Sequence, residues 1–296
     1  MMKDKSFLIE KVVKILLRKN YSLLFSNSCF DIAAKRKDLL LLKVLLNADS
    51  FLKRHAESLK VLSYFLSAKP FLISERDSRG YLDDCVFYFR FGIPVVTLKL
   101  FEEIISDKTT SIIACKGGRK VSIDVKLLKE MRMKSGMSLR RLSEKLGISK
   151  KALYEIESEK VEPSLDTVEK LEEIFKISLR KPYKPNIEPM VIKPTDSFQL
   201  KIYKKLGEIG IRSSSTRSEL FELIGQSSFR IFIKIVRNEG EMKNYSEELK
   251  KASDFFSTKS FLVPKKKIST DYGIPVVTKD RLMSISSAKE LYNTIS

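Results

Sequence analysis

The sequence is poor in the residues that build metal sites and disulfide frameworks. It has 3 cysteines and 1 histidine in 296 residues. Cys29, Cys85 and Cys115 are odd in number and widely spaced without a CxxC pair, which is typical of thiols in a reducing compartment. His55 alone cannot build a zinc site without cysteine or carboxylate ligands at suitable spacing. We therefore expect no metal and no cofactor.

Long apolar runs are also missing. The most apolar stretch, residues 39–46, is short and interrupted by Lys43. The first 17 residues are charged and amphipathic, and they lack the uninterrupted apolar core of a signal peptide. The sequence therefore predicts a cytoplasmic protein without a membrane partner. Its content of 43% hydrophobic and 31% charged residues excludes a disordered chain.

Positive charge, in contrast, is abundant. The sequence has 56 lysines and arginines against 37 aspartates and glutamates, which gives a net charge of +19. Such a balance predicts an anionic partner: nucleic acid, a ribosome or an anionic membrane surface. The alternative is a lysine-rich solvated surface. The charge indicates an anionic partner and does not distinguish among these three kinds.

The two ends of the chain share one sequence pattern. A Phe-acid pair, Phe30-Asp31 or Phe221-Glu222, precedes an apolar run with a lysine at the same spacing. The hexapeptide Gly-Ile-Pro-Val-Val-Thr occurs at 92–97 and again at 273–278. This repetition predicts two copies of one domain, at residues 1–110 and 196–296.

Each copy has the same expected order of elements. An amphipathic helix is followed by two strand-like runs, a second helix, a strand, and a final strand whose threonine caps a closing helix. The helices are expected at 7–18 and 48–66 in the first copy and at 198–209 and 245–256 in the second, and the strands after them at 70–74 and 260–263. Apolar runs that alternate with helices predict an α/β fold with a partly parallel sheet.

Three further segments are predicted between the copies. Residues 111–125 are interpreted as a β-hairpin connector, in which Gly117-Gly118 supplies the turn. Residues 126–180 are interpreted as an all-helical domain. Residues 181–195 are expected to form an extended linker, because Pro182, Pro185, Pro189 and Pro194 exclude a helix.

The all-helical stretch carries helix start and stop signals. Ser138, Ser149 and Ser164 are each placed to cap the N-terminus of a helix, and Gly147 is placed to end one. The short turn at 147–149 joins two helices as in a helix-turn-helix. Apolar residues at helical spacing predict one small core: Leu128, Met131, Leu142, Leu146, Ile148, Leu153, Ile156, Leu165, Val168, Leu171 and Ile174.

The second helix of this motif, about Lys150–Ser158, is the expected recognition helix. Its free N-terminal N–H groups carry partial positive charge, and the major groove of DNA admits a helix. Lysines there reach guanine or phosphate, and arginines on the preceding helix lie over the backbone. The predicted DNA-binding residues are Arg140, Arg141, Ser149, Lys150, Lys151, Tyr154 and Glu155.

This stretch resembles the helix-turn-helix family of the phage lambda and 434 repressors, also called the Cro/C1 type. The Leu-Ser-x-x-Leu-Gly-Ile-Ser run through the turn and the later Pro-Ser-Leu carry the resemblance. It implies that Lys150, Lys151, Tyr154 and Glu155 face bases. It also implies an ion pair between helices from Arg132 to Glu157.

Two positions depart from that family. Leu139 replaces a glutamine that binds phosphate, and Ser143 replaces an alanine at a tightly packed site. The alternative interpretation is that these helices only hold domains together or mediate protein contacts. Since one recognition helix reads a few base pairs, we predict a homodimer that reads two half-sites about one helical turn apart.

The flanking copies resemble the restriction-endonuclease-like core, including archaeal Holliday-junction resolvases. Glu10, Asp31 and Lys43 carry this likeness, which implies Mg²⁺ and an attacking water. However, Leu41 stands where the strand glutamate of that active site belongs. In the second copy Phe232 takes that place, Glu222 replaces Asp31, and Lys201 replaces Glu10.

Three readings of the flanks stay open. The copies could be a degenerate nuclease scaffold that binds a ligand or the DNA backbone, an architectural or dimerisation element, or a Mg²⁺-dependent, structure-selective nuclease. Basic runs at 35–37 and 265–267 are solvated tips or an extension of the DNA footprint. The chain as a whole resembles archaeal transcriptional regulators, through Cys29–Ala34, Leu42–Val44 and Gly92–Pro94.

The sequence thus predicts a multidomain protein: two α/β, degenerate restriction-endonuclease-like domains that flank a lambda-repressor-like helical domain. The expected function is sequence-specific binding of double-stranded DNA in transcription regulation, without enzymatic activity. The alternative is the nuclease that uses Glu10, Asp31 and Lys43. RNA or ribosome binding is a third class, and the absence of stacked aromatic motifs disfavours it.

Overall fold

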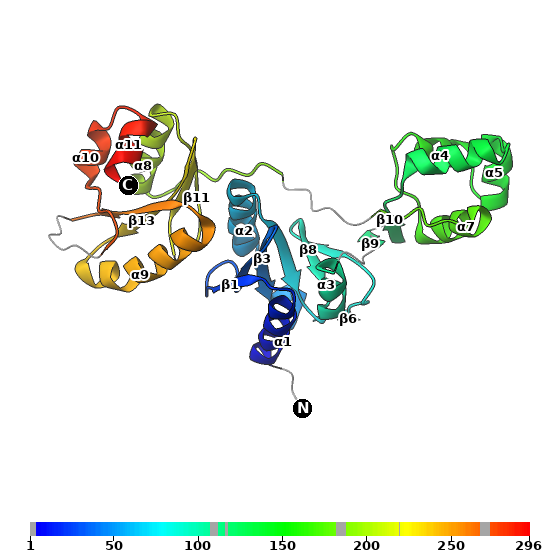
Figure 1. Ribbon diagram of the computed structural model, residues 1–296, viewed down its shortest axis with the longest axis horizontal. Coiled ribbons are helices and arrows are strands. Elements are labelled where there is room, and N and C mark those ends of the chain that lie inside the picture. The colour runs from blue at the N-terminus through cyan, green and yellow to red at the C-terminus, as the bar shows by residue number, and fades with distance from the viewer. Residues whose placement is uncertain (1–3, 107–111, 116–117, 182–187, 219, 267–272) are drawn as a thin grey trace. The chain divides into compact units, whose positions relative to one another are not determined.

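Two compact units make up the chain, each assembled from separate segments. The computed structural model describes residues 4–106, 112–115, 118–181, 188–218, 220–266 and 273–296. Unit 1 comprises Met1–Ile15, Leu45–Asp49 and Leu72–Pro185, and unit 2 comprises Leu16–Val44, Ser50–Phe71 and Asn186–Ser296. Figure 1 labels the helices and strands. None of the described helices is both long and apolar enough to cross a membrane.

The first 106 residues contribute a six-stranded sheet in the order β1-β2-β3-β4-β8-β7. Its strands are β1 (Ser22–Phe25), β2 (Ile32–Lys35), β3 (Leu39–Val44), β4 (Lys69–Ile73), β7 (Tyr88–Arg90) and β8 (Ile93–Val96). The helices of this region are α1 (Lys5–Arg18), α2 (Lys53–Leu66) and α3 (Leu98–Ile104), and a 3-10 turn occupies Ala48–Ser50. A short hairpin of β5 (Arg76–Asp77) and β6 (Gly80–Tyr81) projects beside the sheet.

The C-terminal segment forms a four-stranded sheet in the order β11-β12-β13-β14. Its strands are β11 (Arg212–Ser215), β12 (Leu223–Gln226), β13 (Arg230–Val236) and β14 (Lys259–Pro264). Its helices are α8 (Ser197–Glu208), α9 (Glu239–Phe256), α10 (Lys279–Ser284) and α11 (Ala288–Thr294). The first three strands are antiparallel, whereas β13 and β14 run parallel. Apolar side chains from α8, β13, β14 and the last two helices form its core.

Both sheets contain a strand that the sequence pattern did not predict. Two strand-like runs were expected after the first helix of each copy, and the structure has three, because β1 and β11 precede them. The β11 sequence Arg-Ser-Ser-Ser has no apolar pattern. Its backbone is satisfied by pairing with β12 on one side and by a hydrogen bond from Ser215 N–H to the Ile192 carbonyl on the other. Strand formation there follows from neighbours in space rather than from local sequence.

The repeated hexapeptide behaves differently in its two places. In the first copy, Ile93–Val96 forms β8, which pairs with β4 and with β7. In the second copy the expected final strand is wrong: the described residues show only an isolated bridge between Val276 and Leu262. The second hexapeptide is held to β14 by two hydrogen bonds, from Leu262 N–H to the Pro275 carbonyl and from Val277 N–H to the Leu262 carbonyl, each at 2.9 Å. The threonine caps hold in both, since Thr97 accepts from Leu100 N–H and Thr278 from Arg281 N–H.

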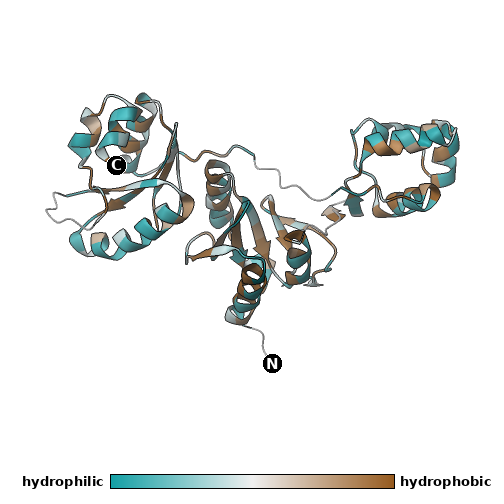
Figure 2. Ribbon diagram, in the orientation of Figure 1, coloured by the Kyte–Doolittle hydropathy of each residue, from teal (hydrophilic) through white to brown (hydrophobic). Residues whose placement is uncertain are grey.

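The central region is helical and shares its core with a β-hairpin. Its elements are β9 (Ile112–Cys115), β10 (Gly118–Val121), α4 (Val125–Lys134), α5 (Leu139–Leu146), α6 (Lys150–Glu157) and α7 (Leu165–Phe175). Figure 2 shows brown and teal alternating along these helices, as expected for amphipathic helices. Gly117 of the expected turn, and Pro182 and Pro185 of the expected linker, lie outside the described residues.

Val86 ties this helical region to the segment before it. Its side chain is 1% exposed and packs in the same cluster as Leu128, Leu142 and Leu153. Ile112 and Ile123 join that cluster from the hairpin side. Hydrogen bonds fix the attachment, from Phe87 N–H to the Ile112 carbonyl at 2.7 Å and from Ala114 N–H to the Phe87 carbonyl at 2.8 Å. The hairpin is therefore part of the hydrophobic core of the helical region.

Candidate DNA-binding interface

Three serine caps set the helix boundaries of the motif, as expected. Ser138 accepts a hydrogen bond from Arg141 N–H, Ser149 from Ala152 N–H, and Ser164 from Thr167 N–H. Each cap satisfies an N–H group that the helix itself leaves without a partner. The three helices α5, α6 and α7 therefore begin where their serines place them.

A left-handed glycine makes the turn between α5 and α6. Gly147 has φ 72° and ψ 29°, and its N–H donates to the carbonyls of Ser143 and Glu144. Ile148 N–H donates to the Ser143 carbonyl, and the Ile148 side chain packs against the core. This geometry suits glycine because a Cβ is disfavoured in the left-handed region. The turn occupies residues 147–149, and α6 begins at the next residue.

The outward side of α6 carries the residues that the sequence singled out. Lys150, Lys151 and Tyr154 are exposed, and the Tyr154 side chain has an exposed fraction of 53%. Glu155 is half-buried. The ammonium of Lys160 lies 5.8 Å from the Tyr154 ring centroid. The first turn of α6 contains no acidic residue, so lysine charge and the helix N-terminus add to one positive surface.

The predicted backbone contacts come from α5. Arg140 is 81% exposed and pairs with Glu144 at 3.0 Å, one turn along the same helix. Such an exposed pair contributes little stability and can exchange for a phosphate. Arg141 is exposed as well. The Ser149 hydroxyl accepts the capping hydrogen bond from Ala152 N–H at 3.0 Å, and a hydroxyl that accepts one hydrogen bond can still donate another.

A largely buried ion pair holds α6 against α4. Arg132 on α4 donates from Nε to Glu157 Oε1 at 2.6 Å and from Nη2 to Oε2 at 3.0 Å. Its Nη1 also donates to the Met137 carbonyl at 3.1 Å. Hydrogen bonding to Glu157 raises the pKa of the Arg132 guanidinium. The pair that the family resemblance implied is therefore present, and it fixes α6 relative to α4.

The two departures from the lambda-repressor pattern have local explanations. Leu139 is half-buried and packs against the apolar core, so it contributes to packing in place of a phosphate contact. Ser143 is 3% exposed, and its hydroxyl donates to the Arg140 carbonyl at 2.8 Å within the same helix. Because that hydroxyl is hydrogen-bonded, serine is tolerated at the tightly packed site.

The N-terminal and C-terminal α/β regions each contain a closed acid–lysine pair. In the N-terminal region, Asp31 accepts from Lys43 Nζ at 3.2 Å and from Val44 N–H at 2.7 Å. In the C-terminal region, Glu222 accepts from Lys234 Nζ at 3.0 Å and from Ile235 N–H at 2.8 Å. Lys43 also donates to the Ser28 carbonyl at 2.9 Å. In both pairs a lysine and a backbone N–H occupy the two carboxylate oxygens.

These residues do not fit a magnesium site. Both oxygens of Asp31 accept hydrogen bonds, one of them from the ammonium of Lys43 at 3.2 Å, and a positive charge so close to the carboxylate opposes the binding of a second cation. Leu41, where a second strand carboxylate belongs, is fully buried. Glu10 is 58% exposed and pairs with Lys14 at 2.5 Å. Within the described ranges, no three acidic, histidine or cysteine side chains cluster as metal ligands.

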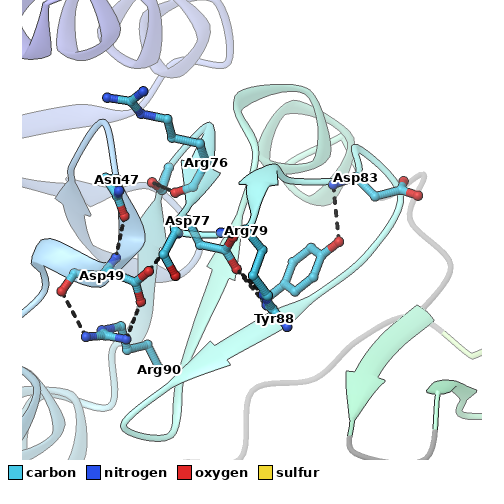
Figure 3. Close-up of polar contacts among 10 residues, drawn as sticks. Asn47, Asp49, Arg76, Asp77, Arg79, Asp83, Tyr88 and Arg90 are labelled. Atoms are coloured by element: carbon cyan, nitrogen blue, oxygen red, sulfur yellow. Dashed lines mark hydrogen bonds and ion pairs between the residues drawn. The ribbon is translucent and has the colours of Figure 1, made fainter.

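A second polar network, which the sequence analysis did not single out, surrounds the β5–β6 hairpin (Figure 3). Asp49 accepts from Ser78 N–H at 2.7 Å and from Arg90 Nη1 at 2.5 Å. Asp77 accepts from Arg79 Nε and Nη2 at 3.0 and 2.6 Å. The bonds from Ser78, with Arg90, hold the pKa of Asp49 below its usual value.

This network lines a cavity of about 290 Å³. The acidic residues of this network, Asp49 and Asp77, are each paired with an arginine (Figure 3). The network therefore joins the segment before α2 to β7 and stabilises the hairpin, and its carboxylates are already neutralised. The partners are far apart in sequence, and no spacing pattern links Asp49 to Arg90. Local sequence patterns therefore could not predict this network.

Two family models match separate parts of the chain. A family model described as "PD-(D/E)XK superfamily domain" matches residues 5–111, and one described as "Helix-turn-helix" matches residues 128–181. No solved structure matches the chain.

Several archaeal proteins that carry the name "Putative HTH-type transcriptional regulatory protein" are similar over most of the chain. One from Methanococcus vannielii is 30% identical over 241 residues, 76% of this chain and 74% of that protein. One from Methanocaldococcus jannaschii is 28% identical and covers 100% of this chain and 98% of its own length. One from Thermococcus kodakarensis is 29% identical and covers 99% and 96%.

Proposed function

The chain belongs to the archaeal family of HTH-type transcriptional regulatory proteins, and we propose that it reads specific duplex sites with α6 in the major groove. Lys150 and Lys151 contact guanine or phosphate, and Tyr154 contacts a thymine methyl or a phosphate. Arg140 and Arg141 contact the backbone beside them. The whole surface belongs to one capped and rigid motif.

One observation carries this proposal: the exposed face of α6 is basic and aromatic, while its buried face is locked by the Arg132–Glu157 pair. A helix that only joined domains would not need an unobstructed, positively charged N-terminus. Affinity for DNA through lysine and arginine is expected to fall as salt rises. Preference among sequences depends on the base-facing side chains.

A competition titration tests the proposal. The wild type and a Lys150→Ala/Lys151→Ala/Tyr154→Ala variant bind fragmented genomic duplex DNA, with tRNA as competitor, at two salt concentrations. The matched control, Lys204→Ala/Lys250→Ala, removes the same charge from exposed positions of α8 and α9. We expect the wild type and the control to retain specific fragments and the triple variant to lose that preference while folded. Equal binding of all nucleic acids by all three proteins would overturn the proposal.

The flanks are proposed to be two copies of one nuclease-like domain that no longer cleave DNA. The matching acid–lysine pairs and the shared strand order support the duplication. A cleavage assay on plasmid and branched DNA with Mg²⁺ or Mn²⁺ tests the loss of activity. Cleavage by the wild type that disappears in a Lys43→Ala variant would instead support the nuclease alternative.

Recognition by two half-sites requires two chains, and a homodimer remains part of the proposal. The surfaces through which the copies meet inside unit 2, at Arg217 and Lys35, are occupied within the chain. The contact between two chains is therefore proposed to use other surfaces. Size-exclusion chromatography with light scattering, with and without a duplex that carries two half-sites, distinguishes a dimer from a monomer.

A further inference from the structure

The α2 and α9 helices of the two copies can be aligned residue by residue. Both end at a serine in the left-handed conformation, Ser67 with φ 55° and Ser257 with φ 54°. When the two helices are aligned by counting back from these serines, five aligned positions are buried in both helices. The matching buried pairs are Ala56 with Ser246, Leu59 with Leu249, Leu62 with Ala252, Ser63 with Ser253, and Leu66 with Phe256.

Helix α2 buries a second face that α9 does not. Ser58 and Val61 are buried on α2, whereas the matching positions on α9 are Glu248 and Lys251, which are exposed. The extra face of α2 meets the second copy, because Arg217 N–H donates to Ser58 Oγ at 2.9 Å. The Arg217 guanidinium also lies 3.9 Å from Glu57. On this side, the junction between the copies is closed.

The matching junction on the other side is open. The loop after β1 corresponds to the loop after β11, because Ser26 N–H donates to the Asp31 carbonyl as Thr216 N–H does to the Glu222 carbonyl. The residue that corresponds to Arg217 is therefore Asn27. A cavity of about 440 Å³ lies between this loop and α9, lined among others by Phe25, Asn27 and Glu248.

The chemistry of this cavity is amphoteric. Glu248 and Lys251 lie one helical turn apart on α9, and the opposite wall offers the Asn27 amide and the hydroxyls of Ser26 and Ser28. Phe25, at 59% exposed, adds an aromatic surface. Lys251 also pairs with Glu247 at 2.6 Å at an exposed position, where such a pair exchanges readily. A zwitterion can contact both charges at once, its ammonium at Glu248 and its carboxylate at Lys251 in exchange for Glu247.

We propose that this open junction binds a free α-amino acid, with the ammonium on Glu248, the carboxylate on Lys251 and the side chain against Phe25. The volume lies within the range of ~300–1,000 Å³ that is typical of small-molecule sites. The site joins both copies, so its occupant bridges them in the way that Arg217 bridges the closed junction. The proposal depends on the proposed duplication for the matched positions and is independent of the reading of DNA.

The test uses the full-length protein without DNA. Each of the common free L-amino acids is screened for a rise in the midpoint of thermal unfolding, and the best is titrated by calorimetry. Asn27→Arg, which reproduces Arg217 at the open junction, is expected to lower its affinity more than about tenfold, or 1.4 kcal/mol. Glu248→Gln and Lys251→Met are expected to weaken it, and the amide and N-acetyl derivatives of that amino acid are expected not to bind.

The matched control is Asn244→Arg, which adds the same side chain at an exposed position of α9 outside the cavity. It is expected to bind as the wild type does. Circular dichroism establishes that each variant is folded. No response of the wild type to any amino acid, or equal binding by Asn27→Arg and Asn244→Arg, would overturn the site. Neither result would bear on DNA recognition, since no DNA is present.

Discussion

Arg132 and Glu157 lie 25 positions apart in the chain and meet through two parallel hydrogen bonds. Their side chains are 13% and 5% exposed. The pair joins α4, the first helix of the helix-turn-helix region, to the last turn of α6. Its geometry is the bidentate arrangement that arginine and carboxylate favour.

Breaking this pair on one side is expected to destabilise the helical region. Glu157→Leu leaves the Arg132 charge without its partner, and the expected loss is roughly 3 kcal/mol of unfolding free energy. Urea unfolding followed by circular dichroism measures it. The double variant Arg132→Met/Glu157→Leu is expected to be more stable than Glu157→Leu alone. A double variant that lost the sum of the two single effects would show that the residues do not interact.

Replacing the turn glycine is expected to loosen α5 and α6 alone. Alanine at position 147 would have to adopt φ 72°, which costs about 1–2 kcal/mol, and no atom within 4 Å would obstruct its Cβ. Amide hydrogen exchange by mass spectrometry should be faster across α5 and α6 in Gly147→Ala. Gly207→Ala, a change inside α8 where the backbone is helical, serves as control and should slow exchange there. Unchanged exchange in α5 and α6 would count against a strained turn.

Salt dependence should report the contribution of Arg141. If Arg141 contacts a phosphate, Arg141→Gln lowers the slope of log affinity against log salt by about 1 and weakens all sequences alike. The control is Lys170→Gln, which removes a charge that is paired with Asp166 on α7. Fluorescence anisotropy with one duplex at several salt concentrations gives the slopes. Equal slopes for the wild type and Arg141→Gln would remove Arg141 from the interface.

Cys29 and Cys85 should differ in reactivity. Burial raises the pKa of the Cys29 thiol to about 11 from 9.0, and its side chain is 1% exposed, whereas Cys85 is exposed. In a Cys115→Ser background, iodoacetamide at mildly alkaline pH should modify Cys85 quickly and Cys29 only after denaturation. Comparable labelling of both thiols in the native protein, read by peptide mass spectrometry, would contradict this.

The same shift predicts a loss of stability in alkali. The contribution of the neutral Cys29 thiol is fully present below its unfolded pKa of 9.0 and is lost as the pH rises toward about 11, where the folded form also ionises. Urea midpoints measured across this interval should fall less in a Cys29→Ala variant than in the wild type.

Local chemistry made the helical motif readable from sequence. Serine caps and a left-handed glycine act within a few residues, so Ser138, Ser149 and Gly147 could be assigned their roles without a structure. The Arg132–Glu157 pair followed from family resemblance instead. The base-facing role of Lys150 and its neighbours stays a prediction, since nothing in the structure tests it.

Pairing between residues that are far apart in the sequence could not be predicted in this way. β11 has the sequence Arg-Ser-Ser-Ser and becomes a strand because β12 and Ile192 satisfy its backbone. The identical hexapeptides differ in their pairing, because the first forms β8 between β4 and β7 whereas the second makes an isolated bridge to Leu262. Arg217 against Ser58 joins residues from opposite ends of the chain. No local propensity encodes such contacts.

The burial of Val86 affects how the helical region of one protein of this family could be replaced by that of another. Val86 belongs to the same buried cluster as Leu128, Leu142 and Leu153, so the hydrophobic core of the helical region includes residues that precede position 126. A chimaera that joined a relative's helices to this chain at that position would combine core residues from two proteins. Mismatched side chains in such a core leave cavities or clash. Evolutionary or engineered exchanges of the helices should therefore also match Val86, Ile112 and Ile123, which belong to the same core.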